Sequence, residues 1–372
     1  MKAIGIILAG GSSEGRLGAL TDHRAAAALP VGSSYRAIDF TLSNMSNSGI
    51  GKVAVLTQYN SRSLRDHLIS SKWWDFGRKQ GGLFVFTPFT SNEGSNWFRG
   101  TADSIYQNIT YLKRSNEKYV VITSGDSTYK MDYREILKYH ESKGADVTVV
   151  YQPMPGKDLT KFGVLEVDAD GKLVNLEEKP EQPKSDNASL GIYVISRELL
   201  IDKLETMVPE GKYNLVKDII IGMKDELKIY GYAYNGYWSS VGAGIAEYFA
   251  TNMDFLNKEI RDVFTKEYPY IETKPKDEPP AKFNAGASVT DSIVGSGTIF
   301  DGKVEHSVIF RKVRVGKDAV VRNSILMEGC VIGEGAVVEN AILDKDVVVS
   351  AGQKVIGASS EEPAVIKKGT VI

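Results

Sequence analysis

Short apolar runs alternate with amphipathic stretches along residues 1–256. The apolar runs have the length of buried strands, whereas the stretches between them repeat apolar residues at helical spacing. Strands are predicted at residues 2–8, 52–57, 119–123 and 146–151, and helices at 61–70, 102–114 and 133–143. This alternation predicts an α/β domain with a mostly parallel, doubly wound sheet. Ligands of such sheets bind beyond the carboxyl ends of the strands, so the loops after Leu8, Thr57 and Thr123 are the predicted site.

The C-terminal part of the chain is repetitive. Asn-Ser-Ile at residues 323–325 recurs 17 residues later as Asn-Ala-Ile at 340–342, and His-Ser-Val stands 17 residues earlier at 306–308. Within each unit, apolar residues fall about six positions apart, which is typical of a hexapeptide β-helix with three faces per turn. A β-sandwich of short strands is the alternative, but it does not account for the 17-residue period.

Proline content marks a change between these two parts. Four of the twelve prolines fall at positions 269, 275, 279 and 280, among charged residues. Such a composition is typical of an extended linker. We therefore expect a first domain at residues 1–256, a proline-rich linker at 257–282 and a β-helix at 283–372.

Charge and cysteine content narrow the class of protein. The formal net charge is −2, which disfavours a nucleic-acid binder with a broad basic surface. No apolar run approaches the ~18 residues of a membrane span. The single cysteine, Cys330, can form neither an intramolecular disulfide nor a cysteine metal cluster. We expect a cytoplasmic protein that binds no membrane and no nucleic acid.

A glycine-rich loop follows the first predicted strand. It runs from Gly10 and Gly11 through Gly15 to Arg16. Small residues let backbone N–H groups approach a phosphate, and an arginine can grip it. Taken alone, such a loop is as compatible with a simple turn as with a phosphate-binding loop.

Several further motifs occur in a fixed order. They are GTADSIYQN at 100–108, SGD at 124–126, EEKP at 177–180, ASLGIY at 188–193 and GYW at 236–238. With the predicted β-helix, they make the chain resemble the ADP-glucose pyrophosphorylases, the glucose-1-phosphate adenylyltransferases of glycogen synthesis, over essentially its whole length. The resemblance implies a Rossmann-like nucleotidyltransferase domain followed by a left-handed parallel β-helix.

The resemblance also implies a reaction and its site. In the family, the phosphate of glucose 1-phosphate attacks the α-phosphorus of ATP, which releases pyrophosphate and needs Mg²⁺ and fixed cations. Carried onto this chain, Arg16 grips phosphate and Asp126 holds the metal. The expected nucleotide-binding residues are Gly10, Gly11, Gly15, Gln107 and Gly125. The expected sugar-phosphate residues are Glu178, Lys179, Ser189 and Gly191.

The chain departs from the family where the triphosphate would lie. Ala26 occupies the position of the family's phosphate-gripping lysine, and Ser240 that of its second metal-binding aspartate. The glycine-rich loop also has one extra residue. A neutral serine is a poor ligand for a hard cation. The loss of a single preorganised charge typically lowers the rate of such a reaction by about 10²–10³.

These departures favour a catalytically impaired subunit that resembles the non-catalytic GlgD type. Such a subunit would bind sugar phosphate or nucleotide sugar and assemble with an active partner, or as a homotetramer; Mg²⁺ would matter only if activity remains. One alternative is an active enzyme in which Arg24 or Glu14 compensates, and another is a sugar-phosphate-sensing scaffold. Family effectors bind between the domains, where Arg36, Lys52 or Arg311 could contribute.

Overall fold

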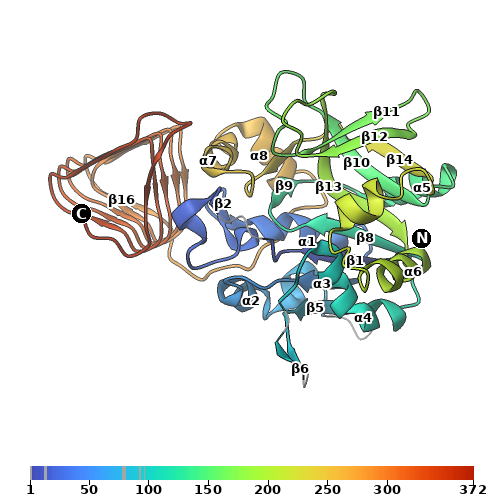
Figure 1. The fold of residues 1–372 in the computed structure, drawn as a ribbon. Helices are drawn as coiled ribbons and strands as arrows, with labels where there is room; N and C mark the ends of the chain where they lie inside the picture. Colours follow the sequence, from blue (N-terminus) through green and yellow to red (C-terminus); the bar gives the residue numbers. More distant parts are fainter. Residues whose placement is uncertain (1, 12–14, 78–80, 92–93, 96) are drawn as a thin grey trace.

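The computed structural model describes residues 2–11, 15–77, 81–91, 94–95 and 97–372. The chain forms an α/β domain followed by a stack of β-coils that packs against one side of it (Figure 1). Among the helices of the described residues, none combines the length and hydropathy that a membrane crossing requires.

A nine-stranded sheet forms the centre of the first domain, as far as the chain is described. The pairs of β8 with β1, β1 with β4 and β4 with β5 are parallel, as predicted. Strand β13 joins β8 in the antiparallel sense, so the sheet is mixed toward this edge. In spatial order the path is β12 (Leu173–Glu178), β11 (Gly163–Val167), β13 (Asn187–Ser196), β8 (Tyr119–Ser124), β1 (Ala3–Leu8), β4 (Lys52–Leu56) and β5 (Gly82–Phe86). Strand β10 (Val147–Pro153) also pairs with β13, and β14 (Ile229–Ala233) pairs with β10.

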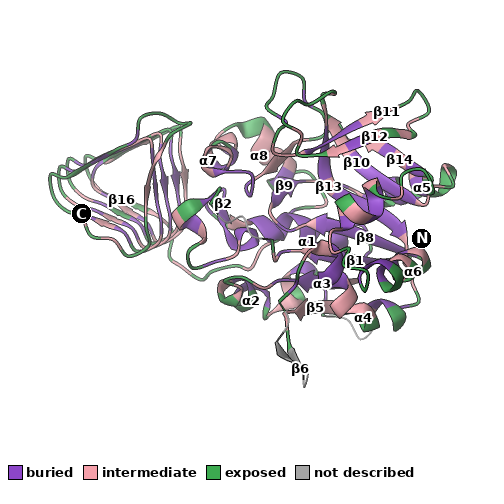
Figure 2. Ribbon diagram, viewed as in Figure 1, coloured by how far each residue is buried: buried purple, intermediate pink, exposed green. Residues whose placement is uncertain are grey.

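Helices cover both faces of this sheet, which explains why β1 and β8 are apolar almost throughout (Figure 2). One face is covered by α1 (Ala37–Asn47), α2 (Arg62–Leu68) and α5 (Tyr133–Ser142). The other is covered by α3 (Thr101–Gln107), α4 (Ile109–Lys113), α6 (Arg197–Met207) and the π-helix η4 (Leu215–Ile221). The single helix predicted at 102–114 is therefore two helices, which meet at Asn108.

Short elements surround the sheet. Two-stranded ladders form between β2 (Pro30–Val31) and β3 (Tyr35–Arg36), between β6 (Thr90–Ser91) and β7 (Gly94–Ser95), and between β9 (Ser127–Tyr129) and β15 (Trp238–Ser240). The 3₁₀ turns are η1 (Gly18–Thr21), η2 (Ala26–Ala28) and η3 (Ser71–Trp74). Helix α7 (Ile245–Asp254) follows β15.

The C-terminal part has three parallel five-stranded sheets, consistent with the left-handed β-helix that was expected. Val320 pairs with Val337, and Val321 with Val338, so these neighbouring coils repeat at the predicted spacing of 17. Other coils depart from it, because Val289 pairs with Val304 and Ile342 with Val365. The first sheet consists of β16 (Lys282–Phe283), β19 (Ile299–Phe300), β22 (Arg314–Val315), β25 (Val331–Ile332) and β28 (Val348–Val349). The second consists of β17 (Ser288–Thr290), β20 (Lys303–Glu305), β23 (Val320–Arg322), β26 (Val337–Glu339) and β29 (Lys354–Ile356). The third consists of β18 (Ile293–Val294), β21 (Val308–Ile309), β24 (Ile325–Leu326), β27 (Ala341–Leu343) and β30 (Ala364–Ile366).

The segment predicted as an extended linker is extended only in part. Its first residues form helix α8 (Lys258–Thr265), whose Phe264 is fully buried and stacks on Phe255. Ile271, farther along, is also buried. The proline and charge content predicted the irregular stretch that follows α8, but it hid a helix whose single apolar face packs on the first domain.

A shared core joins the two parts of the chain. Leu29 and Phe40 of the first domain belong to the same buried cluster as Val308, Ile325 and Ile342 of the β-helix. The segment around Ala26 is thus held against the β-helix, because Ala26 belongs to this cluster as well.

Candidate functional site

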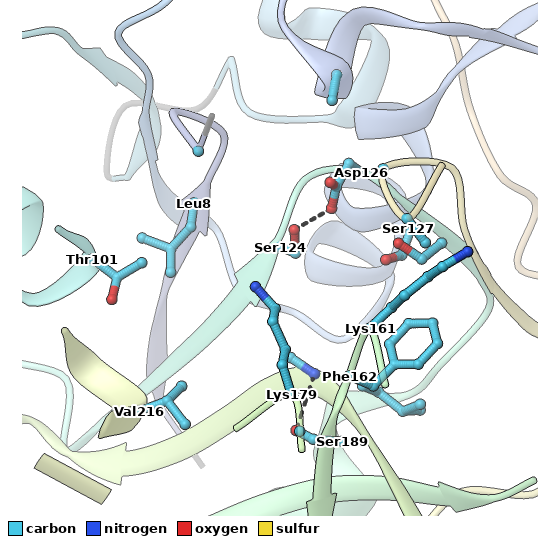
Figure 3. Close-up of a pocket in the computed structure, with 18 of the residues that line it drawn as sticks. Leu8, Thr101, Ser124, Asp126, Ser127, Lys161, Phe162, Lys179, Ser189 and Val216 are labelled. Carbon is cyan, nitrogen blue, oxygen red and sulfur yellow. Dashed lines mark hydrogen bonds between the residues drawn. The ribbon is translucent and has the colours of Figure 1, made fainter. Parts of the chain in front are cut away.

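A cavity of about 300 Å³ opens beyond the carboxyl ends of β1 and β8, where the strand order predicted a site. Leu8 and Ser124 are the last residues of these two strands, and both line it (Figure 3). The predicted site residues that line this cavity are Gly11, Arg16, Ala26, Asp126, Glu178, Lys179, Ser189, Gly191 and Ser240. The fold therefore brings together residues from six separate motifs.

One wall carries the predicted sugar-phosphate residues. Lys179 follows β12 in a left-handed turn, with φ at 51°, and its backbone N–H donates to the carbonyl of Phe162 at 3.0 Å. A non-glycine residue rarely adopts this conformation. Figure 3 shows that the turn sends the lysine side chain up into the cavity toward Ser124. The carboxylate of Glu178 lies 3.7 Å from the Lys179 ammonium.

Ser189 and Gly191 reach the cavity through a β-bulge in β13. The register between β10 and β13 shifts here, because Val150 pairs with Ile192 but Tyr151 pairs with Ser189. A bulge turns side chains out of the regular ladder. Gly191 has φ at 68° and its N–H donates to the Ser189 hydroxyl at 3.4 Å. The glycine of the ASLGIY motif is therefore required by a left-handed backbone.

The opposite wall has one carboxylate where the resemblance implies two. Ser240 pairs with Ser127 across the β9–β15 ladder, and the N–H of Val241 donates to the carbonyl of Asp126 at 3.0 Å. Ser240 and Asp126 thus lie on the same side of the cavity, and the chain supplies only a hydroxyl at the second position.

The Asp126 carboxylate is also engaged within the protein. One oxygen accepts a hydrogen bond from the Ser124 hydroxyl, and a Cβ atom at Gly242 would lie 1.9 Å from the other. Among the described residues, no three His, Cys, Asp or Glu side chains are grouped so that they could hold a metal ion. The residues present do not fit the two-carboxylate Mg²⁺ site that the resemblance implies.

The position of the lost lysine faces the same cavity. Ala26 begins the 3₁₀ turn η2, is 8% exposed and lines the cavity with the exposed Arg16. Arg24, a candidate to compensate, points elsewhere: its guanidinium pairs with Asp344 of the β-helix at 2.7 Å, and the two side chains are 4% and 2% exposed. Arg24 therefore cannot replace the lysine. Glu14, the other candidate, lies outside the described residues.

The predicted nucleotide-binding residues divide into three groups. Gly10 and Gly11 line an adjoining cavity of about 290 Å³, which shares Leu8 and Thr101 with the first. Gly125 packs beneath the loop, since a Cβ there would lie 3.1 Å from Ile7 and 3.3 Å from Ala27. Gly15 and Gln107 line neither cavity. The Gln107 amide donates to Asp103 at 2.8 Å, and its contact with nucleotide stays a prediction.

Lys161 and Phe162 are among the side chains of the first cavity that were not predicted. Lys161 and Phe162 precede β11, and the Phe162 ring meets Trp238 edge-on at a centroid distance of 5.7 Å. Lys161 forms an ion pair with Glu247 of α7. The sequence signal was present in the KFG triplet before an apolar strand, but nothing local marks that strand as an edge of the site.

A third cavity, of about 310 Å³, lies between the two parts of the chain. Arg36 and Arg311 line it, together with Lys274, Lys276 and Lys345. Burial lowers the pKa of Arg36 and of Lys345. Of the three residues expected in this region, Lys52 does not contribute, because its ammonium donates to the Ser115 hydroxyl at 2.6 Å on another part of the surface.

Comparison with known proteins agrees with the two-part architecture. A family model described as "Nucleotidyl transferase" matches residues 4–258, and one described as "GlmU-like, C-terminal hexapeptide" matches residues 279–368.

Curated relatives span most of the chain. A glucose-1-phosphate adenylyltransferase of Clostridium novyi (strain NT) is 39% identical over 326 residues, which cover 86% of this chain and 84% of the relative. That of Geobacillus stearothermophilus is 39% identical over 326 residues, covering 86% and 83%. That of Bacillus subtilis (strain 168) is 38% identical over 324 residues, covering 86% and 84%.

Proposed function

Because the chain belongs to the glucose-1-phosphate adenylyltransferase family, we propose that it is a catalytically impaired, regulatory member of that family, of the GlgD type. In this proposal the protein acts in the cytoplasm in glycogen biosynthesis. It binds a sugar phosphate or a nucleotide sugar and modulates an active subunit that converts ATP and glucose 1-phosphate to ADP-glucose and pyrophosphate. It assembles with that subunit into a hetero-oligomer, or into a homotetramer in its absence.

The observation that carries the proposal is the contrast between the two walls of the 300 Å³ cavity. Lys179 and Ser189 keep the sugar-phosphate wall polar and charged. On the other wall, Ala26 and Ser240 remove one positive and one negative group that the family places around the triphosphate. Binding of the sugar end persists in this arrangement, whereas stabilisation of the charge that develops on the transferred phosphorus is lost.

The size of the defect follows from the same contrast. Removal of one preorganised charged group typically slows phosphoryl or acyl transfer by about 10²–10³. Two such losses at one reacting centre are not additive, so the combined defect is at least that of the larger one. The buried Arg24–Asp344 pair supports the proposal, since it keeps the Arg24 guanidinium, close to Ala26 in the sequence, out of the cavity.

The proposal is tested by restoring both groups. The double variant Ala26→Lys/Ser240→Asp is assayed for pyrophosphate release from ATP and glucose 1-phosphate in the presence of Mg²⁺. A rise of about 10² or more over the unaltered chain is expected. The matched control is Ala26→Met/Ser240→Asn, which adds nearly the same atoms without the charges and leaves the rate unchanged.

Two results contradict the proposal. Full family-like activity of the unaltered chain would mean that other residues carry the phosphates and the metal. An active relative whose kinetics and sedimentation are unaffected by the purified chain would instead favour a scaffold that senses sugar phosphate alone.

A further inference from the structure

Lys161 is a cation of the cavity that neither the sequence nor the family resemblance assigned. It lines the cavity together with Asp126 and Ser240, and it lies just before β11 and next to Phe162, whose carbonyl accepts the Lys179 N–H. Figure 3 shows Lys179 rising toward Ser124, while Lys161 turns to the other side, past Ser127. Its ammonium is held there by the carboxylate of Glu247, from the first turn of α7.

The Lys161–Glu247 pair is only partly satisfied. The two side chains are 37% and 32% exposed, so solvent screens their attraction. The second carboxylate oxygen of Glu247 is buried and has no hydrogen-bond partner among the described residues. An ion pair of this kind exchanges readily when a stronger anion with more acceptor oxygens enters, because a phosphate offers the ammonium several short charge-assisted hydrogen bonds.

The pair lies beside the loop that lost its metal ligand. After Ser240 this loop passes two glycines, and each lies close to a carboxylate. A Cβ at Gly242 would lie 1.9 Å from Asp126, and one at Gly244 would lie 2.5 Å from Glu247 and 3.8 Å from the Lys161 ammonium. The Lys161 ammonium thus lies close to the loop in which Ser240 replaces the family's second metal-binding aspartate.

We propose that Lys161 is the cation that this chain turns onto the phosphates of a bound nucleotide sugar in place of a metal ion, and that Glu247 holds it back until the ligand arrives. The inference rests on the proposed function, because it concerns the ligand of that same site. The inference gives Lys161 and Glu247 opposite effects on ligand binding. The lysine favours binding, whereas the carboxylate of Glu247 competes with the ligand for the lysine. Binding then proceeds without Mg²⁺.

The experiment measures ADP-glucose binding to the full chain by calorimetry, in EDTA and again in Mg²⁺. Lys161→Met weakens binding in EDTA about tenfold or more, the effect typical of losing a charge-assisted hydrogen bond. Glu247→Gln tightens it several-fold. In Lys161→Met/Glu247→Gln the tightening disappears, because the carboxylate acts through the lysine. The matched control is Lys113→Met, which breaks the exposed Lys113–Glu205 pair outside the cavity and leaves binding unchanged.

The outcomes separate this inference from the proposed function. If Glu247→Gln weakens binding as Lys161→Met does, the pair only supports the loop and the inference is wrong. If binding needs Mg²⁺, or Lys161→Met binds normally in EDTA, the inference fails while the proposed function stands. If the unaltered chain binds no ADP-glucose with or without Mg²⁺, both this inference and the ligand named in the proposed function are overturned.

Discussion

The ion pair between Arg24 and Asp344 joins the degenerate phosphate loop to the β-helix, and its removal is predicted to destabilise the whole chain. The Arg24 guanidinium lies 2.7 Å from the Asp344 carboxylate, and a second guanidinium nitrogen lies 3.6 Å from the sulfur of Met327. With side chains 4% and 2% exposed, neither charge is solvated by bulk water. Asp344→Ala therefore leaves a buried guanidinium without its counter-charge.

The magnitude follows from this burial. At an effective dielectric constant of about 20, unit charges at this separation attract by about 6 kcal/mol, most of which offsets their desolvation. Removing one partner of such a pair costs about 3–5 kcal/mol. With an unfolding entropy of about 2 cal/mol/K for each of the 372 residues, this loss lowers Tm by about 4–6 °C.

The measurement is urea unfolding followed by circular dichroism, with Tm from calorimetry as a second readout. The exposed-pair variant Lys113→Met serves as the control and is expected to lose less than about 0.5 kcal/mol. Arg24→Met/Asp344→Leu is expected to recover most of the loss, because it removes both buried charges. If Asp344→Ala loses no more unfolding free energy than the control, or if the double variant is as unstable as the single one, the buried ion pair does not stabilise the chain as argued from its burial.

Three further predictions concern other buried groups. Burial lowers the pKa of His140 to about 4, so the unfolded chain binds a proton that the folded chain does not bind. The free energy of unfolding therefore falls as the pH drops from 6.5 to 4. His140→Gln is expected to flatten that part of the profile of unfolding free energy against pH, measured by urea unfolding. Burial alone would raise the pKa of Glu328, but the cations of Arg311 and Lys345 outweigh it and bring the pKa to about 2. The stabilisation by the Glu328 carboxylate is therefore present above pH 4.5 and lost as the pH falls toward 2. The unfolding free energy of Glu328→Gln is expected to depend less on pH over that range. Gly242→Ala drives a methyl group into Asp126 and lowers the unfolding free energy by about 1–3 kcal/mol, measured by urea titration. The control for replacing a glycine is Gly51→Ala, because Gly51 has open space around its Cβ position and no left-handed backbone.

The sequence predicted the architecture because both patterns are periodic. Buried strands such as β1 and β8 are apolar almost throughout, since helices cover both faces, and the 17-residue period matches the register of several neighbouring coils. Helix α8 was missed because only one face of it is apolar and prolines follow closely. The mostly parallel sheet was predicted, but not that β13 is the strand that joins β8 in the antiparallel sense, since strand direction depends on this long-range pairing.

The site was predicted in so far as its residues lie within motifs. Lys179, Ser189 and Asp126 line the cavity because each follows or interrupts a strand that ends there. Arg24 could not be placed from sequence, because its partner Asp344 is 320 residues away. Lys161 went unnoticed for a similar reason, since its ion pair with Glu247 depends on how α7 packs beside β11. Long-range charge pairing decides which cations face the ligand, and local patterns do not encode it.

The most direct test of the central claim is pyrophosphate release from ATP and glucose 1-phosphate by the purified chain, alone and mixed with an active glucose-1-phosphate adenylyltransferase subunit. The proposed regulatory role predicts a rate at least 10² below that of the active subunit for the chain alone, and altered kinetics of the active subunit in the mixture. A family-like rate for the chain alone would contradict the interpretation that Ala26 and Ser240 impair catalysis. An unchanged partner in the mixture would contradict the regulatory role.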